Sequence, residues 1–441
     1  MKQSKHNIYY SPKEVRTILE RSIDTALDGL KGYCNDPVSD FTRCRKLPAR
    51  TLIECIMSFS NYSSIGELSH FFVGHGEMPS ASALSQRRQL LDPDIFKRIN
   101  NLFVSAFDDH TTINGYHILA QDGSDVNIPF MDDKTKTEKH DAKSFCQYHV
   151  NALYDCINKV FYDWSIDAAS KKREVNALIS ILKDRNYPQN SIFTADRGYE
   201  SYNLMAHFIE NDTKFVIRVK DIHTKSGLMT NIKTEEGAFD MRINRTLTSL
   251  QTKEIKADKE KYIFVPSTSN FDFLDENRDF YDLSFRAVRF KISEDVYETV
   301  VTNLSEEEFG TDDFKELYHY RWNEETAFNK LKYTIGLVYF HARKRKLIQQ
   351  EINAAFLMYN VSEVIIRNID LKKNKKPKLE YDYKPNFSSA VTNIRLYLRK
   401  KISMKELIHR IKKFLVGQRP ERSFERNIKG QSCKPLNYRT S

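Results

Sequence analysis

Glycine and proline are sparse in this chain: its 441 residues include only 14 Gly and 12 Pro. Such a low content argues against long disordered or linker segments. Long apolar runs are also lacking, because the most apolar stretch, residues 352–366, is interrupted by Asn360, Ser362 and Glu363. A membrane-spanning helix needs about 18 or more apolar residues, so no membrane contact is expected. The N-terminus shows no apolar secretory signal, and we expect a cytoplasmic protein.

Cysteine is used sparingly and without the spacing of a disulfide framework or a zinc ribbon. The six cysteines stand at positions 34, 44, 55, 146, 156 and 433, and no two are separated by only two residues. The nearest metal-like group is Cys146-x-x-His149, with His140 and Cys156 close by in the sequence. It falls on an expected strand and has no matching second pair, so buried reduced thiols explain it more simply.

Positive charge is concentrated near the C-terminus. The whole chain has a net charge of +10, whereas residues 371–441 alone hold 20 Lys and Arg against 5 Asp and Glu. This segment therefore carries +15, and the remaining 370 residues sum to −5. A basic segment on a slightly acidic body favours a polyanionic partner, most often nucleic acid. A surface that only aids solubility is the alternative.

Four polar residues near position 320 have the spacing of one helix face. Arg321, Glu325 and Lys332 follow Tyr318 at +3, +7 and +14. At about 100° per residue, all four side chains project from a stripe about 60° wide. One acid between two cations and a phenol would allow the acid to bind a metal while its neighbours contact phosphate oxygens. The alternative is an amphipathic helix with an incidental Arg321–Glu325 ion pair.

The apolar residues of the same segment occupy the neighbouring arc of this expected helix, which we expect to begin at residues 311–313. They are Leu317, Tyr320, Ala327, Phe328 and Leu331. Glu324 lies inside the apolar arc, and the sequence offers no reason for an acid there.

Two aspartates follow short apolar runs that are typical of buried strands. Asp122-Gly123 comes after Ile118-Leu119-Ala120, and Asp196-Arg197-Gly198 comes after residues 192–195. We expect each strand to end at its aspartate, with the glycine permitting a tight exit. Carboxylates brought together at such an edge need a cation, and hard oxygen ligands suit Mg²⁺ or Mn²⁺. For either aspartate alone, a turn or cap residue is the alternative.

Other carboxylates compete for this role. Asp125, Asp163 and Asp167 lie in the same part of the sequence, and we rank them below Asp122.

The rest of the chain divides by pattern. Residues 1–112 are expected to be helical, with capping boxes at Ser11–Glu14 and Ser64–Glu67. A further helix is expected from residue 79 to residue 91. This pair of short helices resembles a helix-turn-helix, which would place Arg87 and Arg88 at DNA; an ordinary packing pair is the alternative.

Residues 113–345 are expected to form the core domain, in which residues 115–220 alternate strands and helices. The expected strands are 116–122, 147–155, 159–166, the strand before Asp196, and 214–219; the expected helices are 172–185 and 200–210. Residues 221–303 form a β-rich insertion whose last strands, 283–292 and 296–303, make a hairpin with a bulge at Ala287–Val288. Residues 346–441 form a basic helical region, with helices at 347–369 and 387–415 and a polar linker at 370–386.

The pattern Tyr318-x-x-Arg321-x-x-x-Glu325-x-x-x-x-x-x-Lys332, with QDGSD around Asp122 and ADRGYES around Asp196, resembles the insertion-sequence-4 family of bacterial DDE transposases. The resemblance implies an α/β fold: an RNase H-like mixed sheet core with a β-rich insertion, a helical N-terminal domain and a helical basic C-terminal region. It implies that Asp122, Asp196 and Glu325 are the catalytic metal ligands for two Mg²⁺ or Mn²⁺ ions.

The resemblance further implies that Tyr318, Arg321 and Lys332 contact DNA. The expected activity is cleavage of insertion-sequence ends and strand transfer into target DNA. The expected partners are double-stranded DNA, as terminal inverted repeats and target, and a second copy of the chain in a synaptic complex. The expected location is the bacterial cytoplasm, in association with the nucleoid.

Two other functions remain open. An RNase H-like nuclease would use the same acids without strand transfer, and a DNA-binding repressor descended from a transposase would use none of them. One departure concerns the hairpin step of some relatives, which relies on a tryptophan in the insertion. The only tryptophans here are Trp164 and Trp322. An insertion aromatic would have to replace it: Tyr262, Phe264, Phe285 or Tyr297.

Overall fold

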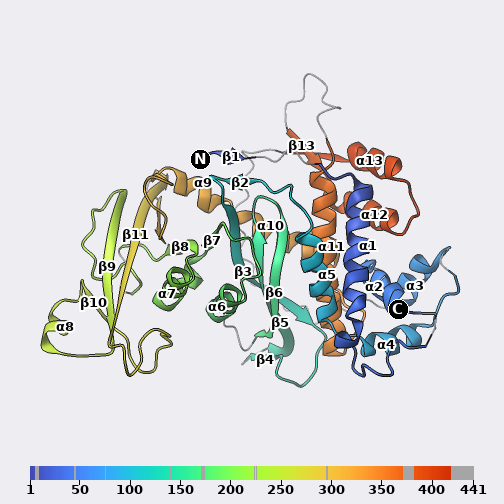
Figure 1. Cartoon of the computed structure of the whole chain (residues 1–441), viewed down its shortest axis with the longest axis horizontal. Helices are drawn as coiled ribbons and strands as arrows, with labels where there is room; N and C mark the ends of the chain where they lie inside the picture. The colour runs from blue at the N-terminus through green and yellow to red at the C-terminus, as the bar shows by residue number, and fades with distance from the viewer. Residues whose placement is uncertain are drawn as a thin grey trace.

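The computed structural model describes residues 1–4, 9–43, 46–74, 76–139, 142–169, 174–222, 224, 226–294, 296–370 and 382–418. The molecule is elongated, and Figure 1 shows β-rich structure at one end, helices at the other and a central sheet between them. In the described part of the chain, no helix has both the length and the apolar character needed to cross a membrane.

Five strands form the centre of a mixed sheet, and the alternation of strands and helices expected over residues 115–220 is confirmed. In spatial order they are β6 (Val160–Ala168), β5 (Ala142–Asp155), β3 (His117–Ile128), β7 (Ser191–Ala195) and β8 (Lys214–Val219). The first three pair antiparallel, whereas β3, β7 and β8 run parallel. Strand β7 is buried along its whole length, which matches its continuous apolar sequence.

The β-rich insertion extends this sheet. Strand β12 (Val296–Thr302) pairs with β8, and the order continues through β11 (Phe280–Ser293), β9 (Phe239–Thr248) and β10 (Tyr262–Phe264). The expected bulge at Ala287–Val288 is wrong, because both residues pair in regular register with β12. The irregularity lies at residues 291–293, next to the turn.

Two helices, which come between β6 and β8 in the chain, pack against this sheet. They are α6 (Glu174–Asp184) and α7 (Tyr202–Glu210). Their apolar residues Leu178, Leu182 and Leu204 pack with Leu119 and Phe193 of the sheet. The remaining elements of this half are short: β1 (Gln3–Ser4), β2 (Thr112–Ile113), β4 (Lys136–Lys139) and α8 (Lys253–Ala257).

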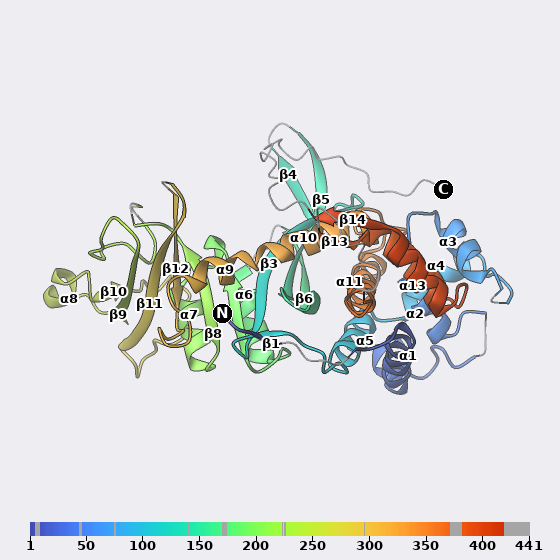
Figure 2. The same ribbon diagram turned by 90° about the horizontal axis from the view of Figure 1, so that it is seen from above.

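The helical end is built around α11 (Arg345–Arg367), which is buried along most of its length. The helices of this end are α1 (Pro12–Asp28), α2 (Ala49–Met57), α3 (Ser64–Phe72), α4 (Ala81–Leu90), α5 (Asp94–Val104), α12 (Phe387–Leu398) and α13 (Met404–Lys413). N-terminal and C-terminal helices therefore share one core, as Figure 2 shows from above. A short strand pair, β13 (Asp382–Pro385) with β14 (Leu415–Gln418), was not expected.

Helix α11 is joined to the sheet by buried polar contacts. The Asn353 side chain accepts a hydrogen bond from Trp164 Nε1 (2.7 Å), and Asn360 accepts one from the Phe161 backbone N–H (2.8 Å). Buried amides of this kind require defined partners, so they fix the position of α11 on β6.

One of the two predicted capping boxes is confirmed, because both hydrogen bonds of the Ser11–Glu14 box are present. The Ser64–Glu67 box is wrong, because Ser63 caps α3 by accepting from the Gly66 N–H. Glu67 is buried instead, and its carboxylate accepts hydrogen bonds from the backbone N–H groups of Ser60 and Tyr62.

A buried charge network joins the N-terminal helices to α11. Arg88 is 3% exposed, and its Nη2 donates to Glu351 Oε1 (2.8 Å) and to the Leu347 carbonyl (2.7 Å). His341 lies between Glu351 (3.1 Å) and Glu67 (3.3 Å). The Arg88 guanidinium is therefore engaged inside the protein in this structure, and its expected contact with DNA stays a prediction.

Replacing Arg88 by Met should lower the free energy of unfolding by about 3 kcal/mol, because Glu351 would keep a buried charge with one partner fewer. Exposed Arg98 on α5 provides the control, since Arg98→Met should change stability by less than about 0.5 kcal/mol. Urea denaturation measures both.

This destabilisation should also depend on pH. The neighbouring Arg88 and His341 outweigh burial and lower the pKa of Glu351 from 4.5 to about 2. A carboxyl group with a lowered folded-state pKa stabilises the protein above its ordinary pKa and loses that contribution as pH falls toward 2. The difference between wild type and Arg88→Met should therefore shrink below pH 4.5. A difference that is independent of pH would contradict this account of the network.

Candidate active site

Two of the three predicted acids are brought together by strand pairing. Strand β3 pairs parallel with β7, and Gln121 lies opposite Ala195 in the last step of the register. Asp122 and Asp196 therefore follow at adjacent positions on neighbouring strands, which lie about 4.8 Å apart. The expectation that β3 ends at Asp122 is wrong, because β3 continues to Ile128 along β5; the strand that ends there is β7.

The third acid, Glu325, lies on a helix that packs against the face of the sheet to which Asp122 points. Ile118 and Ala120 share a core with Ala327 and Phe328 of α10 (Trp322–Lys330). Because side chains alternate along a strand, Asp122 points to the same side as these residues. Figure 2 shows α9 (Asp313–His319) and α10 running along the sheet from the β-rich end toward α11.

The single helix expected over this segment is divided into three pieces. It begins at Asp313, as expected, but α9 ends at His319 and α10 starts after Arg321. A π-helical turn, Leu331–Ile335, follows and ends at Gly336, whose φ of 117° favours glycine. The even 100° spacing therefore does not extend to Lys332.

One buried guanidinium contacts two of the acids. Arg321 is 3% exposed; its Nη1 lies 3.5 Å from Asp122 Oδ2 and its Nη2 lies 3.5 Å from Glu325 Oε1. The guanidinium also faces the Tyr318 ring, 5.6 Å from its centroid. Both ion pairs are long, so Arg321 compensates the two carboxylates only in part.

The electrostatics of Asp122 show that this edge is rich in negative charge. Burial raises the pKa of Asp122 to about 6, with Asp196 and Glu325 adding repulsion; the Gly123 N–H and Arg321 oppose this. An acid in this setting is ionised more readily once a cation is near.

The other predicted DNA-contacting residues are placed unevenly. Tyr318 is 2% exposed and its hydroxyl is buried, and its expected hydrogen bond to a DNA phosphate stays a prediction. Lys332 is half-buried near Asp125, and burial lowers its pKa. Arg87 is half-buried and donates to the Leu47 carbonyl (3.1 Å).

Glu324, for which the sequence offered no explanation, lies on α10 near Asp122. It is fully buried, and burial together with nearby Asp122 raises its pKa well above the usual range. Arg321 and the backbone N–H of Asp122 oppose this rise. Burial therefore favours the neutral form of the Glu324 carboxyl group.

A polar cluster on the opposite face of β3 was missed. His149 is buried between Asp125 (Nδ1 to Oδ1, 2.7 Å) and Glu174 (Nε2 to Oε1, 3.0 Å). Burial would lower the pKa of His149, but the bonds to both carboxylates raise it to about 9. The available signal was strand alternation, because Gly123 and Asp125 pair directly with Asn151 and His149 of β5.

The competing residues have structural partners. Cys146 Sγ donates to the Met131 carbonyl (3.0 Å), and His149 is held as described, while His140 lies outside the described residues. Asp163 lies 3.5 Å from Lys97, and Asp167 is exposed on β6.

The three acids fit a hard divalent cation by their chemistry. Within the described ranges, no three His, Cys, Asp or Glu side chains are close enough to form a complete metal cluster. Each of the three segments nevertheless supplies one carboxylate, and burial raises the pKa of Asp122, with a smaller contribution from Asp196 and Glu325. Oxygen donors with excess negative charge are what Mg²⁺ and Mn²⁺ prefer.

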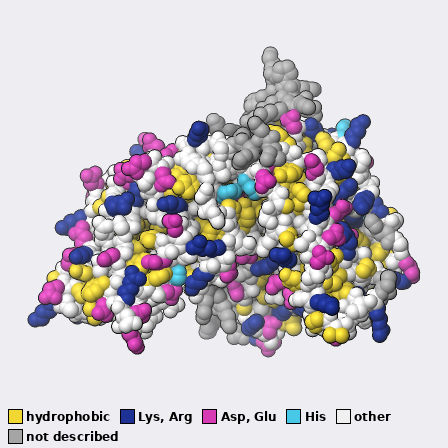
Figure 3. Space-filling model, viewed as in Figure 1, with side chains coloured by type: hydrophobic (Ala, Val, Ile, Leu, Met, Phe, Trp, Pro, Cys, Tyr) yellow, Lys and Arg dark blue, Asp and Glu magenta, His cyan; other side chains and the backbone are white. Residues whose placement is uncertain are grey.

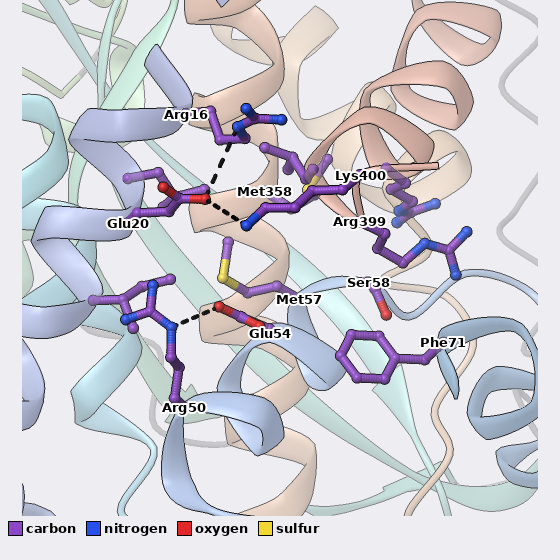
Figure 4. A pocket seen from close by; sticks show the side chains of 14 residues that line it. Arg16, Glu20, Arg50, Glu54, Met57, Ser58, Phe71, Met358, Arg399 and Lys400 are labelled. Atoms are coloured by element: carbon purple, nitrogen blue, oxygen red, sulfur yellow. Dashed lines mark hydrogen bonds and ion pairs between the residues drawn. The ribbon is translucent and has the colours of Figure 1, made fainter. Parts of the chain in front are cut away.

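A large cavity lies elsewhere, between the N-terminal and C-terminal helices. It has a volume of about 440 Å³, and none of the three acids lines it. Figure 4 shows Arg16, Arg50 and Lys400 at its walls, paired with Glu20 and Glu54. Arg395 also lines it, although its Nη2 donates to the Ile335 carbonyl (3.1 Å).

Charges of both signs are interspersed over the face of the molecule in Figure 3. Much of the basic C-terminal segment, residues 371–381 and 419–441, lies outside the described residues.

A model of the Transposase DDE domain family matches residues 113–361, more than half of the chain, so the chain belongs to this family. The family catalyses DNA cleavage and strand transfer, and this protein is a DNA transposase. No curated protein sequence matches the chain. Among solved structures, the piggyBac transposase synaptic complex with hairpin DNA is similar at 12% identity and a TM-score of 0.46, over 96% of this chain and 90% of that chain.

Gly123→Ala should perturb the site. A Cβ atom there would lie 2.6 Å from His149 Cε1 and 2.9 Å from Glu174 Oε1, so the buried imidazole would have to move. We expect a loss of about 1–3 kcal/mol in the free energy of unfolding. Gly237→Ala, where no atom lies within 4 Å, should be nearly neutral. Equal stability of the two variants would show that the His149 packing is not needed.

Proposed function

We propose that Asp122, Asp196 and Glu325 together hold two divalent cations, Mg²⁺ or Mn²⁺, at the exposed edge between β3 and β7. The observation that carries this proposal is the convergence of the three acids: Asp122 and Asp196 are register neighbours, and Arg321 contacts both Asp122 and Glu325. When bound, such cations would activate the attacking water or DNA 3′-hydroxyl and stabilise the leaving oxygen.

The chain's own residues support this chemistry in different ways. Arg321 orients Asp122 and Glu325. Because Arg321 is buried, its first role is contact with these acids, and contact with DNA is secondary. Tyr318 supports the guanidinium from its ring face. Lys332, on the π-helical turn, is proposed to contact a DNA phosphate as a point charge. Arg87, on α4, is the remaining candidate for contact with the terminal repeat.

We place the protein in the insertion-sequence-4 group on the spacing of Tyr318, Arg321, Glu325 and Lys332. Its substrates would then be the terminal inverted repeats of its own element and target DNA. We also propose that two copies of the chain act together in a synaptic complex near the bacterial nucleoid. For a hairpin step, Phe264 is the best-placed insertion aromatic, because it is 44% exposed whereas Phe285 is buried.

Replacing any one acid should abolish cleavage and leave DNA binding nearly unchanged. Asp122→Asn, Asp196→Asn and Glu325→Gln should each slow Mg²⁺-dependent cutting by about a thousandfold, or about 4 kcal/mol of activation free energy. The assay uses DNA fragments with the inverted repeats that flank the gene. Asp163→Asn is the control, because Asp163 lies by Lys97 on β6. Wild-type cutting by Glu325→Gln would overturn the assignment.

Strand transfer separates this proposal from the alternatives. Pre-cut repeat ends with 3′-hydroxyl groups, incubated with wild-type protein, Mg²⁺ and a supercoiled plasmid, should become covalently joined to it. Agarose gels detect the joined product. An RNase H-like nuclease would cut without joining, and a repressor would only retard the DNA in a gel shift.

A further inference from the structure

The acid at the start of α6 lies at the same sheet edge as the proposed metal site. Glu174 is the first residue of α6. A Cβ atom built on Gly198 would lie 3.0 Å from Asp196 Oδ1 and 3.6 Å from Glu174 Oε2. Only a methyl-sized space therefore separates the two carboxylates. Glycine at this position keeps the space open.

The other carboxylate oxygen of Glu174, Oε1, contacts a buried histidine. His149 Nε2 lies 3.0 Å from Glu174 Oε1, and His149 Nδ1 lies 2.7 Å from Asp125 Oδ1. The imidazole is 2% exposed, whereas Glu174 is 31% exposed. A buried ring therefore fixes a carboxylate that reaches the surface, an arrangement typical of residues that orient metal ligands.

Two fully buried polar side chains, Tyr199 and Gln121, lie next to each other at this edge. The Gln121 amide has no further hydrogen-bond partner among the described residues. Tyr199 lies within electrostatic reach of Glu174 and Asp122. A buried amide whose hydrogen-bonding positions are not all filled marks a place where water or an ion completes the structure.

We propose that Glu174 is a fourth acid of the metal site, which supplies an oxygen to a divalent cation beside Asp196, and that His149 is the residue that positions it. This inference rests on the proposed function of Asp122, Asp196 and Glu325. Water bound to the cation would complete the hydrogen bonding of the Gln121 amide. The acid reaches the site from the α6 side of the sheet, opposite to Glu325 on α10.

The test is direct Mn²⁺ binding to the full-length protein without DNA, followed by electron paramagnetic resonance. Glu174→Gln keeps an acceptor for His149 but loses the charge, and it should weaken Mn²⁺ binding at one ion by about tenfold or more. His149→Gln should weaken the same ion. Asp184→Asn, at the other end of α6 and exposed, should bind as wild type does. Thermal melting in EDTA verifies that each variant is folded.

The outcomes distinguish a failure of this inference from a failure of the proposed three-acid metal site. If Asp196→Asn loses Mn²⁺ affinity while folded Glu174→Gln binds like wild type, the fourth acid is wrong and the three-acid site stands. If neither substitution changes Mn²⁺ binding, the metal site itself is wrong. Weaker binding in Glu174→Gln and His149→Gln, with Asp184→Asn unchanged, supports the inference.

Discussion

The parallel pairing of β3 with β7 is the constraint on which the site depends. Its register sets Gln121 opposite Ala195, so the next residue of each segment is an aspartate at the same edge. A shift of one residue would turn one carboxylate to the other face of the sheet. The strands are held in that register by buried apolar side chains such as Leu119 and Phe193. The burial of these apolar side chains offsets the repulsion between the two carboxylates.

The third acid depends on a different kind of contact. Glu325 is carried by a helix segment that runs across the sheet, and buried Arg321 connects it to Asp122. The same segment continues through a π-helical turn to His341, which joins Glu351 of α11 and Glu67 of α3. Packing and ion pairs therefore connect the helical end of the molecule to the segment that carries Glu325.

Local sequence signals predicted the parts of the fold that depend on neighbouring residues. The Ser11–Glu14 capping box and the strand at 214–219 were placed correctly for this reason. Features set by distant partners were missed. The sequence placed Arg88 on a helix expected to contact DNA, and it gave no sign of the buried ion pair with Glu351, which is 263 residues away. The break at Tyr320–Arg321 and the contact of Gly123 with His149 likewise depend on tertiary packing.

The central claim is that segments around residues 122, 196 and 325 share bound metal. Fe²⁺ substituted for Mg²⁺, with ascorbate and peroxide, generates hydroxyl radicals that cut the polypeptide next to the ion. Mass spectrometry of the fragments should show cuts clustered at all three segments, suppressed by excess Mg²⁺. A pattern in which any one of the three segments remains uncut would contradict the account.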